Sequence, residues 1–228
     1  MRSVLVGFCV LIVSLSVRAQ VNTHYNLPNY DNRKLHYGFQ LALNYSGFKV
    51  KQSSHFVNQD TVQSVRGIGS GAFALGFILN YRLSDFFDAR FLPTVAFYER
   101  TIRYQFKSVE EPIDAIFESS FIELPLLLKY KSYRRKNLRM YMIGGLKPGI
   151  EVGARKRERR NDQLRTQSLD LSIDYGFGLD IYYPLFKFSP ELRFSLGLSN
   201  LFNEDDNIFS NSIDGLSTYT VTLYLLFE

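Results

Sequence analysis

The sequence predicts an all-β protein, an eight-stranded antiparallel up-and-down transmembrane β-barrel preceded by a cleaved signal peptide. Three observations predict it. Eight stretches alternate large apolar residues with polar or small ones, which is the period of two that a β-strand imposes. The connections between these stretches are alternately short and long. The first 19 residues have the charge and apolar pattern of an export signal.

Residues 1–19 are predicted to be the signal peptide. Arg2 precedes a short apolar run, and small residues precede a cleavage site after Ala19. The run is too short for a spanning helix, which needs about 20 apolar residues. Residues 20–34 are then expected to form a periplasmic N-terminal arm, and residues 35–228 the outer-membrane barrel.

The composition limits the classes of function. There are 27 basic and 22 acidic residues, a net charge of +5, and removal of Arg2 and Arg18 with the signal leaves +3. This charge is too mild to indicate a nucleic-acid partner. The only cysteine, Cys9, leaves with the signal, so no disulfide or thiolate chemistry is expected. No later stretch reaches about 18 consecutive apolar residues, so no helical span is expected.

The first four predicted strands cover 35–46, 72–81, 87–97 and 122–130. In the first, the odd positions are aromatic or aliphatic and the even positions are polar or small, and the second repeats this pattern. Pro125 falls inside the fourth strand and is expected at a bulge, because proline has no N–H for the ladder.

The last four predicted strands cover 140–152, 169–183, 188–198 and 219–227. The stretch 169–183 alternates most regularly, with apolar residues at odd positions and three aspartates among the even ones. Pro190 lies in the seventh strand and is also expected at a bulge.

The connections decide which face meets water. Long, polar connections alternate with short ones along the chain. The three short connections are 84–86, 132–137 and 184–186. The four long connections are 51–65, 101–115, 155–167 and 203–215. Outer-membrane barrels have short periplasmic turns and long outer loops, whereas sandwich connections mix lengths. We therefore expect the apolar face to meet lipid and both termini to be periplasmic. A soluble β-sandwich is the alternative.

The polar face carries charges of both signs among small residues. We expect these charges to form a paired ionic network that plugs the lumen, because unpaired buried charges are costly. Glu123 and Lys147 should meet Asp170 or Asp174, Glu191 and Arg193 should meet Asp174, and Arg139 should lie near Asp180. We expect this network to have a structural role rather than a role in transport. The alternative is that the charged face is a solvated surface. The predicted network comprises Arg90, Glu123, Lys129, Arg139, Lys147, Asp170, Asp174, Asp180, Glu191 and Arg193.

Catalytic and metal sites have little support in the sequence. The three histidines, His24, His36 and His55, have no Ser or Asp at a recognisable spacing, so the protein is not expected to be an enzyme. The acidic stretch 203–207 lacks the glycine and terminal Glu of a calcium loop. No cofactor, metal or small-molecule substrate is therefore predicted.

Two basic clusters are candidate partner-binding sites. The predicted outer loop could face lipid phosphates or an acidic partner, although a solvated rim is an equal alternative. The predicted periplasmic turn could hold a periplasmic partner, although such turns more often cap strand ends. The loop residues are Arg155, Lys156, Arg157, Arg159 and Arg160, and the turn residues are Arg134, Arg135 and Lys136.

Two stretches, NLPNYDNRKLHYGF (26–39) and ESSFIELPLLLKYKSYRRKNLRMYMIGGLKPGIE (118–151), resemble the PorT family of outer-membrane β-barrels from the Bacteroidota. The resemblance implies an accessory or assembly role in the type IX protein secretion system, with other secretion-system components and outer-membrane lipids as partners. It brings no catalytic residue set. The alternative is a generic OmpA-like structural or adhesive outer-membrane barrel.

Overall fold

The computed structural model describes residues 25–52, 62–106, 113–152, 169–199 and 213–228. A short 3₁₀ helix, η2 (Tyr30–Asn32), precedes ten strands. In the order of the chain they are β1 (Leu35–Gln52), β2 (Val62–Arg82), β3 (Phe87–Phe91), β4 (Thr94–Phe106), β5 (Ile113–Glu123), β6 (Leu126–Lys131), β7 (Leu138–Val152), β8 (Leu169–Tyr182), β9 (Lys187–Gly197) and β10 (Ile213–Phe227). No helix in these ranges is long and apolar enough to cross a membrane.

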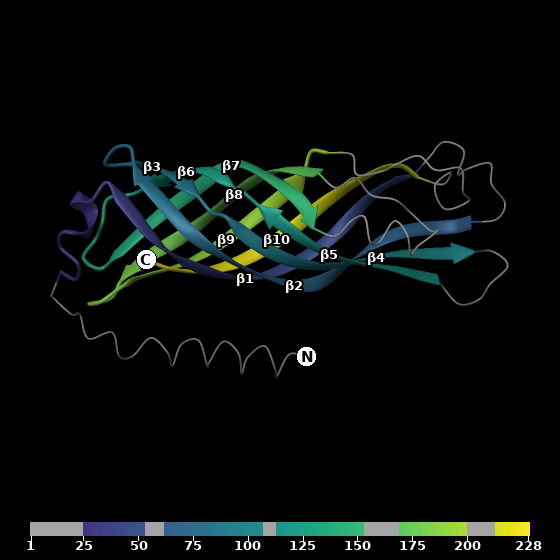
Figure 1. Ribbon diagram of the computed structural model, residues 1–228, viewed down its shortest axis with the longest axis horizontal. Helices are drawn as coiled ribbons and strands as arrows, with labels where there is room; N and C mark the ends of the chain where they lie inside the picture. Colours follow the sequence, from purple (N-terminus) through teal and green to yellow (C-terminus); the bar gives the residue numbers. More distant parts are fainter. Residues whose placement is uncertain (1–24, 53–61, 107–112, 153–168, 200–212) are drawn as a thin grey trace, which may run out of the picture.

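The strands form one closed antiparallel sheet (Figure 1). β1 pairs with both β2 and β10, which closes the ring. β3 and β4 follow one another along a single stave, as do β5 and β6, so the ring has eight staves and the predicted eight-stranded barrel is confirmed.

Prolines cause the two breaks within staves. Pro93 separates β3 from β4, and Pro125 separates β5 from β6, because neither can donate a ladder hydrogen bond. The carbonyls at the breaks still accept, since Leu92 N donates to Pro125 O over 3.1 Å. Pro190 lies within β9 opposite Leu225 in an unshifted register, so the bulge expected there is absent.

Several strands are longer than the sequence pattern predicts. β2 begins at Val62, and β4 and β5 cover much of the predicted loop 101–115. Beyond about Phe97 the outward residues are no longer apolar, so the alternation that marks a lipid-facing strand disappears although the ladder continues. Within the described ranges β5 pairs with β7 only over Ser120–Glu123, and the described parts of β2, β4 and β5 extend furthest along the barrel axis (Figure 1).

The faces of the sheet are inverted relative to a soluble protein. Outward side chains such as Tyr37 (74% exposed) and Phe77 (70%) are apolar, while lumen side chains such as Arg90 and Lys129 are fully buried. On β1 the outward apolar residues run from Leu35 to Tyr45, close to the 9–11 residues of a transmembrane strand. We call these outward residues, with their equivalents on the other strands, the apolar band. The arrangement excludes a soluble sandwich.

Candidate functional site: the barrel lumen and the short-turn end

The middle of the lumen is crossed by a chain of ion pairs. Arg90 Nη1 on β3 lies 3.0 Å from Glu191 Oε2 on β9, across the barrel. Arg193 pairs with the same Glu191, and its Nη1 is 3.5 Å from Asp174 Oδ2 on β8. Tyr141 Oη also donates to Glu191, over 2.8 Å. Because the four charged side chains are fully buried, their charges must be balanced within the lumen.

A second layer of ion pairs lies nearer the end that carries the short turns, which we call the short-turn end. Lys129 Nζ is 2.7 Å from Asp180 Oδ2, and Lys131 Nζ is 2.5 Å from Asp88 Oδ1. Lys187 Nζ lies 3.0 Å from Glu228 Oε2, at the end of the chain. Each of the carboxylates in this layer therefore has a cation beside it.

A third layer lies toward the opposite end. Lys147 Nζ is 3.3 Å from Glu123 Oε1, which also accepts a hydrogen bond from Tyr98 Oη over 2.8 Å. The space left between Arg100, Glu123, Lys147 and their neighbours is about 10 Å³. A cavity of this size holds one water at most. The lumen is thus occluded at this level by its own side chains.

The lumen also holds an apolar cluster. Inward side chains from β1, β2, β4, β5, β6, β7 and β10 contribute to it, including Ala42, Ala74, Ala96, Ile78 and Leu127. Small alanines let the strands approach and fill the narrow interior without voids.

The structure brings most of the predicted network residues together. Lys147 contacts Glu123, and Arg193 contacts both Glu191 and Asp174, as the sequence pattern predicts. Asp170 instead accepts a hydrogen bond from Thr218 Oγ1 over 3.0 Å. Arg139 lies opposite Asp180 in the strand register, but its ion pair is with Asp31.

Sequence reasoning missed several members of the lumen network. Asp88 and Lys131 share the alternation phase of Arg90 and Lys129 and could have been found from it. Glu228 lies one residue beyond the last predicted strand and shares the phase of the inward Thr220 and Thr222. The lumen tyrosines, such as Tyr141, were missed because an aromatic residue on a polar face breaks the expected pattern.

The N-terminal segment 25–34 docks on the short-turn end of the barrel. The Arg134 guanidinium lies between the rings of Tyr25 and Tyr182, at 3.9 and 3.5 Å from their centroids. It also donates to the carbonyls of Asn26 and Leu27 and reaches Asp31 Oδ2 at 3.4 Å. Only 3% of its side chain is exposed. Arg134 is thus occupied by its own chain and is not available to a separate partner.

Asp31 and Tyr30 complete this contact. Asp31 Oδ1 lies 2.9 Å from Arg139 Nη1, and although burial alone raises the pKa of the Asp31 carboxyl, Arg139 and then Arg134 hold it below its usual range. Tyr30 Oη donates to Glu228 Oε2 over 2.8 Å. Burial, and then the Glu228 carboxylate, raise the pKa of the Tyr30 hydroxyl. Asp31 is therefore kept ionised beside Arg139 and Arg134, and Tyr30 is kept protonated so that it can donate to Glu228.

Other predicted site residues are placed as follows. Arg135 and Lys136 are exposed at the turn between β6 and β7. The basic loop residues Arg155, Lys156, Arg157, Arg159 and Arg160 lie outside the described ranges. His36 stacks on Tyr30 at 4.1 Å and donates to its carbonyl, which is a structural role. Among the described residues no group of three or more His, Cys, Asp or Glu could hold a metal ion.

Comparisons with known proteins find one matching family and several similar solved structures. The sequence profile of the family described as outer membrane protein beta-barrel domain matches residues 18–203. No curated protein matches the chain. Among solved structures, OprG from Pseudomonas aeruginosa is similar with 11% identity and a TM-score of 0.42, over 83% of this chain and 92% of that one.

Two further solved structures are similar at the same level. Neisserial surface protein A has 11% identity and a TM-score of 0.41, over 85% of this chain and 98% of that one. Ail, the attachment invasion locus protein of Yersinia pestis, has 12% identity and a TM-score of 0.35, over 86% of this chain and 98% of that one.

Proposed function

This chain belongs to the family of outer-membrane β-barrel domains, and from that premise we propose that it is an accessory or assembly component of the type IX protein secretion system that acts through its surfaces. One observation carries the surface mode of action. Three layers of buried ion pairs lie in the lumen, one of them spans it from Arg90 to Glu191, and the space left beside another is only about 10 Å³. Cargo cannot pass such a lumen, so contacts must be made from outside.

The secretion role itself rests on the resemblance of residues 26–39 and 118–151 to the PorT family. The second stretch covers part of β5, all of β6 and most of β7, with the turn 132–137 between β6 and β7. It therefore forms part of the wall and of the short-turn end. We place this end, with residues 20–34 and the C-terminus, in the periplasm, after removal of residues 1–19. Other secretion-system components are the proposed partners there, alongside the lipids around the wall.

The short-turn end offers a surface for such a partner. Tyr133 is 76% exposed and Leu185 is 92% exposed, each on a turn at this end. Arg135 and Lys136 are exposed beside Tyr133. A mixed apolar and basic surface of this kind suits an acidic periplasmic protein. Because Arg134 holds residues 25–34, a substitution of Arg134 would disturb both the fold and this surface.

The test is to delete the gene and follow proteins that bear the C-terminal secretion domain. We expect them to accumulate in the periplasm and to return to the medium and cell surface on complementation. Complementation with Arg135→Glu/Lys136→Glu should restore less export than complementation with Arg66→Glu, an exposed charge reversal on β2. Unchanged export after deletion would refute the secretion role.

A generic OmpA-like structural or adhesive role is the second candidate. The observation that favours it is that β2, β4 and β5 extend past the apolar band and present a surface beyond the membrane. A deletion strain with normal export but weakened detergent resistance or surface attachment would support this candidate instead.

A further inference from the structure

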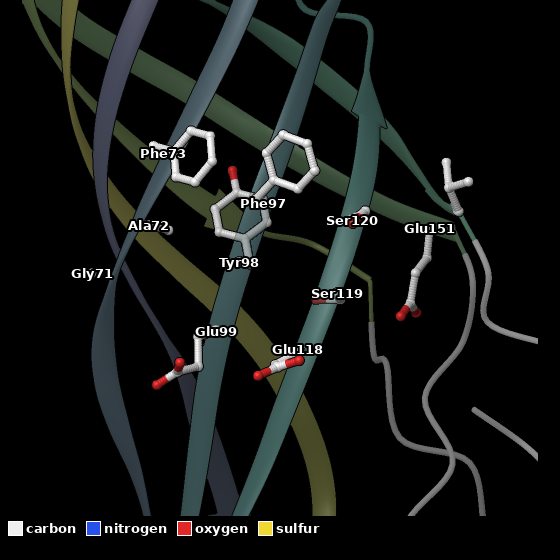
Figure 2. A pocket seen from close by; sticks show the side chains of 11 residues that line it. Gly71, Ala72, Phe73, Phe97, Tyr98, Glu99, Glu118, Ser119, Ser120 and Glu151 are labelled. Carbon is white, nitrogen blue, oxygen red and sulfur yellow. The ribbon is translucent and has the colours of Figure 1, made fainter. Parts of the chain in front are cut away.

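A small polar space lies beside the Lys147–Glu123 ion pair, in the third layer of the lumen. It measures about 10 Å³, and its lining includes Ser172, Thr218 and Thr220, which all carry hydroxyl groups. Each of these three residues is at most 5% exposed. The larger groove in the wall, of about 470 Å³, shares none of the lining residues of this space (Figure 2). A space of this volume with several polar partners has room for one water.

Asp170 brings an unsatisfied carboxylate oxygen to this space. Its Oδ2 accepts a hydrogen bond from Thr218 Oγ1 over 3.0 Å, whereas its Oδ1 is buried and has no hydrogen-bond partner among the described residues. Asp170 is itself one of the residues that line the space. Buried polar atoms are almost always satisfied by the protein or by ordered water, so Asp170 Oδ1 needs a donor.

The charges around the space are already balanced. Arg100 and Lys147 are the cationic side chains that line it, and Glu123 and Asp170 are the anionic ones. A bound ion of either sign would therefore add an uncompensated charge at a buried position, which is costly. A neutral ligand is favoured, and the volume admits only one as small as water.

We propose that one ordered water occupies this space and donates a hydrogen bond to Asp170 Oδ1. The Lys147 ammonium has three N–H groups and lies 3.3 Å from Glu123 Oε1, so it can also donate to the water. The Ser172 hydroxyl is available to accept the second proton of the water. The water joins Asp170 on β8 to the Lys147–Glu123 pair, so the third layer closes the lumen with side chains and one bound water together.

Gly149 allows the space to be filled without strain. It lines the space from β7, and an added Cβ would make only ordinary contacts, the nearest to Phe121 Cδ1 at 3.5 Å. Gly149→Ala should therefore expel the water. Filling an empty space would stabilise the barrel. Because the water satisfies Asp170, we expect instead that the ratio of folded to unfolded chain falls about tenfold, as loss of a hydrogen bond to a buried charged group predicts.

The experiment is equilibrium unfolding of the full chain by urea in lipid vesicles, for the wild type, Gly149→Ala, Asp170→Ala and the double variant. Without the Asp170 carboxylate the water is not needed, so Gly149→Ala should then leave the ratio unchanged or raise it. Gly144→Ala, whose Cβ would meet only Asp174 O at 3.8 Å, is the control and should change the ratio little in either background. An unchanged or higher ratio in Gly149→Ala alone, or the same loss with and without Asp170, would overturn the proposal.

Nuclear magnetic resonance of the full chain in nanodiscs observes the water directly. We expect a nuclear Overhauser contact between water and the Hα protons of Gly149, and none for Gly144, which lies on the outward face of β7. Heat-dependent gel mobility checks that each variant folds. If Gly149→Ala does not fold, the spectrum of the wild type decides, and a missing contact at Gly149 contradicts the proposal.

Discussion

Asp31 is the residue at which the N-terminal segment and the barrel meet. Its carboxylate contacts Arg139 at 2.9 Å and Arg134 at 3.4 Å, and Tyr182 Oη lies 3.4 Å away. The strand pattern predicts Arg139 beside Asp180, and the backbone register agrees. Arg139 nevertheless turns to Asp31, because the N-terminal segment supplies a carboxylate that strand periodicity cannot place.

The docking of residues 25–34 should depend on pH. The pKa of Asp31 is lowered in the folded state, so its contribution is fully present above the usual carboxyl pKa and is lost as the pH falls through the lowered value. A spin label at Asn29→Cys, in a Cys9→Ser background, should be immobile at neutral pH and mobile in strong acid. The transition should be absent in Asp31→Asn. A label that stays immobile throughout would show that Asp31 does not hold the segment.

Lys129 tests the buried charges. Its ammonium faces Asp180 at 2.7 Å, and both side chains are buried. Lys129→Met removes the nearest cation of Asp180, which keeps Lys187 Nζ at 3.9 Å and the Ser189 hydroxyl, and it should lower the free energy of unfolding by about 1–3 kcal/mol. Lys136→Met, at an exposed position, should change it by less than about 0.5 kcal/mol. The measurement is equilibrium unfolding by urea in lipid vesicles, and equal effects of the two changes would mean that the pair contributes no net stability.

At the scale of the elements, period-two alternation predicted eight strands because each stave crosses lipid with one apolar face. It could not predict where strands end beyond the membrane, since the outward residues of β4 after Phe97 no longer need to be apolar. It also could not separate β3 from β4, because a proline break does not change which face a side chain takes. Pro190 does not divide β9, although the ladder between β8 and β9 has no pair at Pro190 and Ser189.

Two adjacent glycines in β7 test the packing of the wall. A Cβ at Gly145 would overlap Leu126 O on β6, whereas a Cβ at Gly144 would meet only Asp174 O at 3.8 Å. Gly145→Ala should therefore destabilise the barrel by about 1–3 kcal/mol, as overpacking does. Gly144→Ala should have little effect. The fraction of barrel with folded gel mobility after refolding measures both, and equal yields would contradict the close approach of β6 and β7.

At the scale of the whole molecule, the sequence predicted an occluded ionic lumen but not its arrangement. Alternation places Arg90, Glu191 and Arg193 on the inner face, yet Arg90 meets Glu191 across the barrel because of closure and strand stagger. The same limit applies to Glu99 and Glu118, which become neighbours through the long pairing of β4 with β5. Part of that pairing lies within residues 101–115, which the sequence pattern predicts to be a loop.

Single-channel recording in planar bilayers tests the central claim, that the barrel is closed and acts through its surfaces. We predict no steady open level for the full chain, and none after deletion of residues 25–34, because the ion pairs of Arg90, Arg193 and Lys147 lie deeper in the lumen than that segment. A steady open conductance of the full chain would contradict the account and would require transport through the lumen.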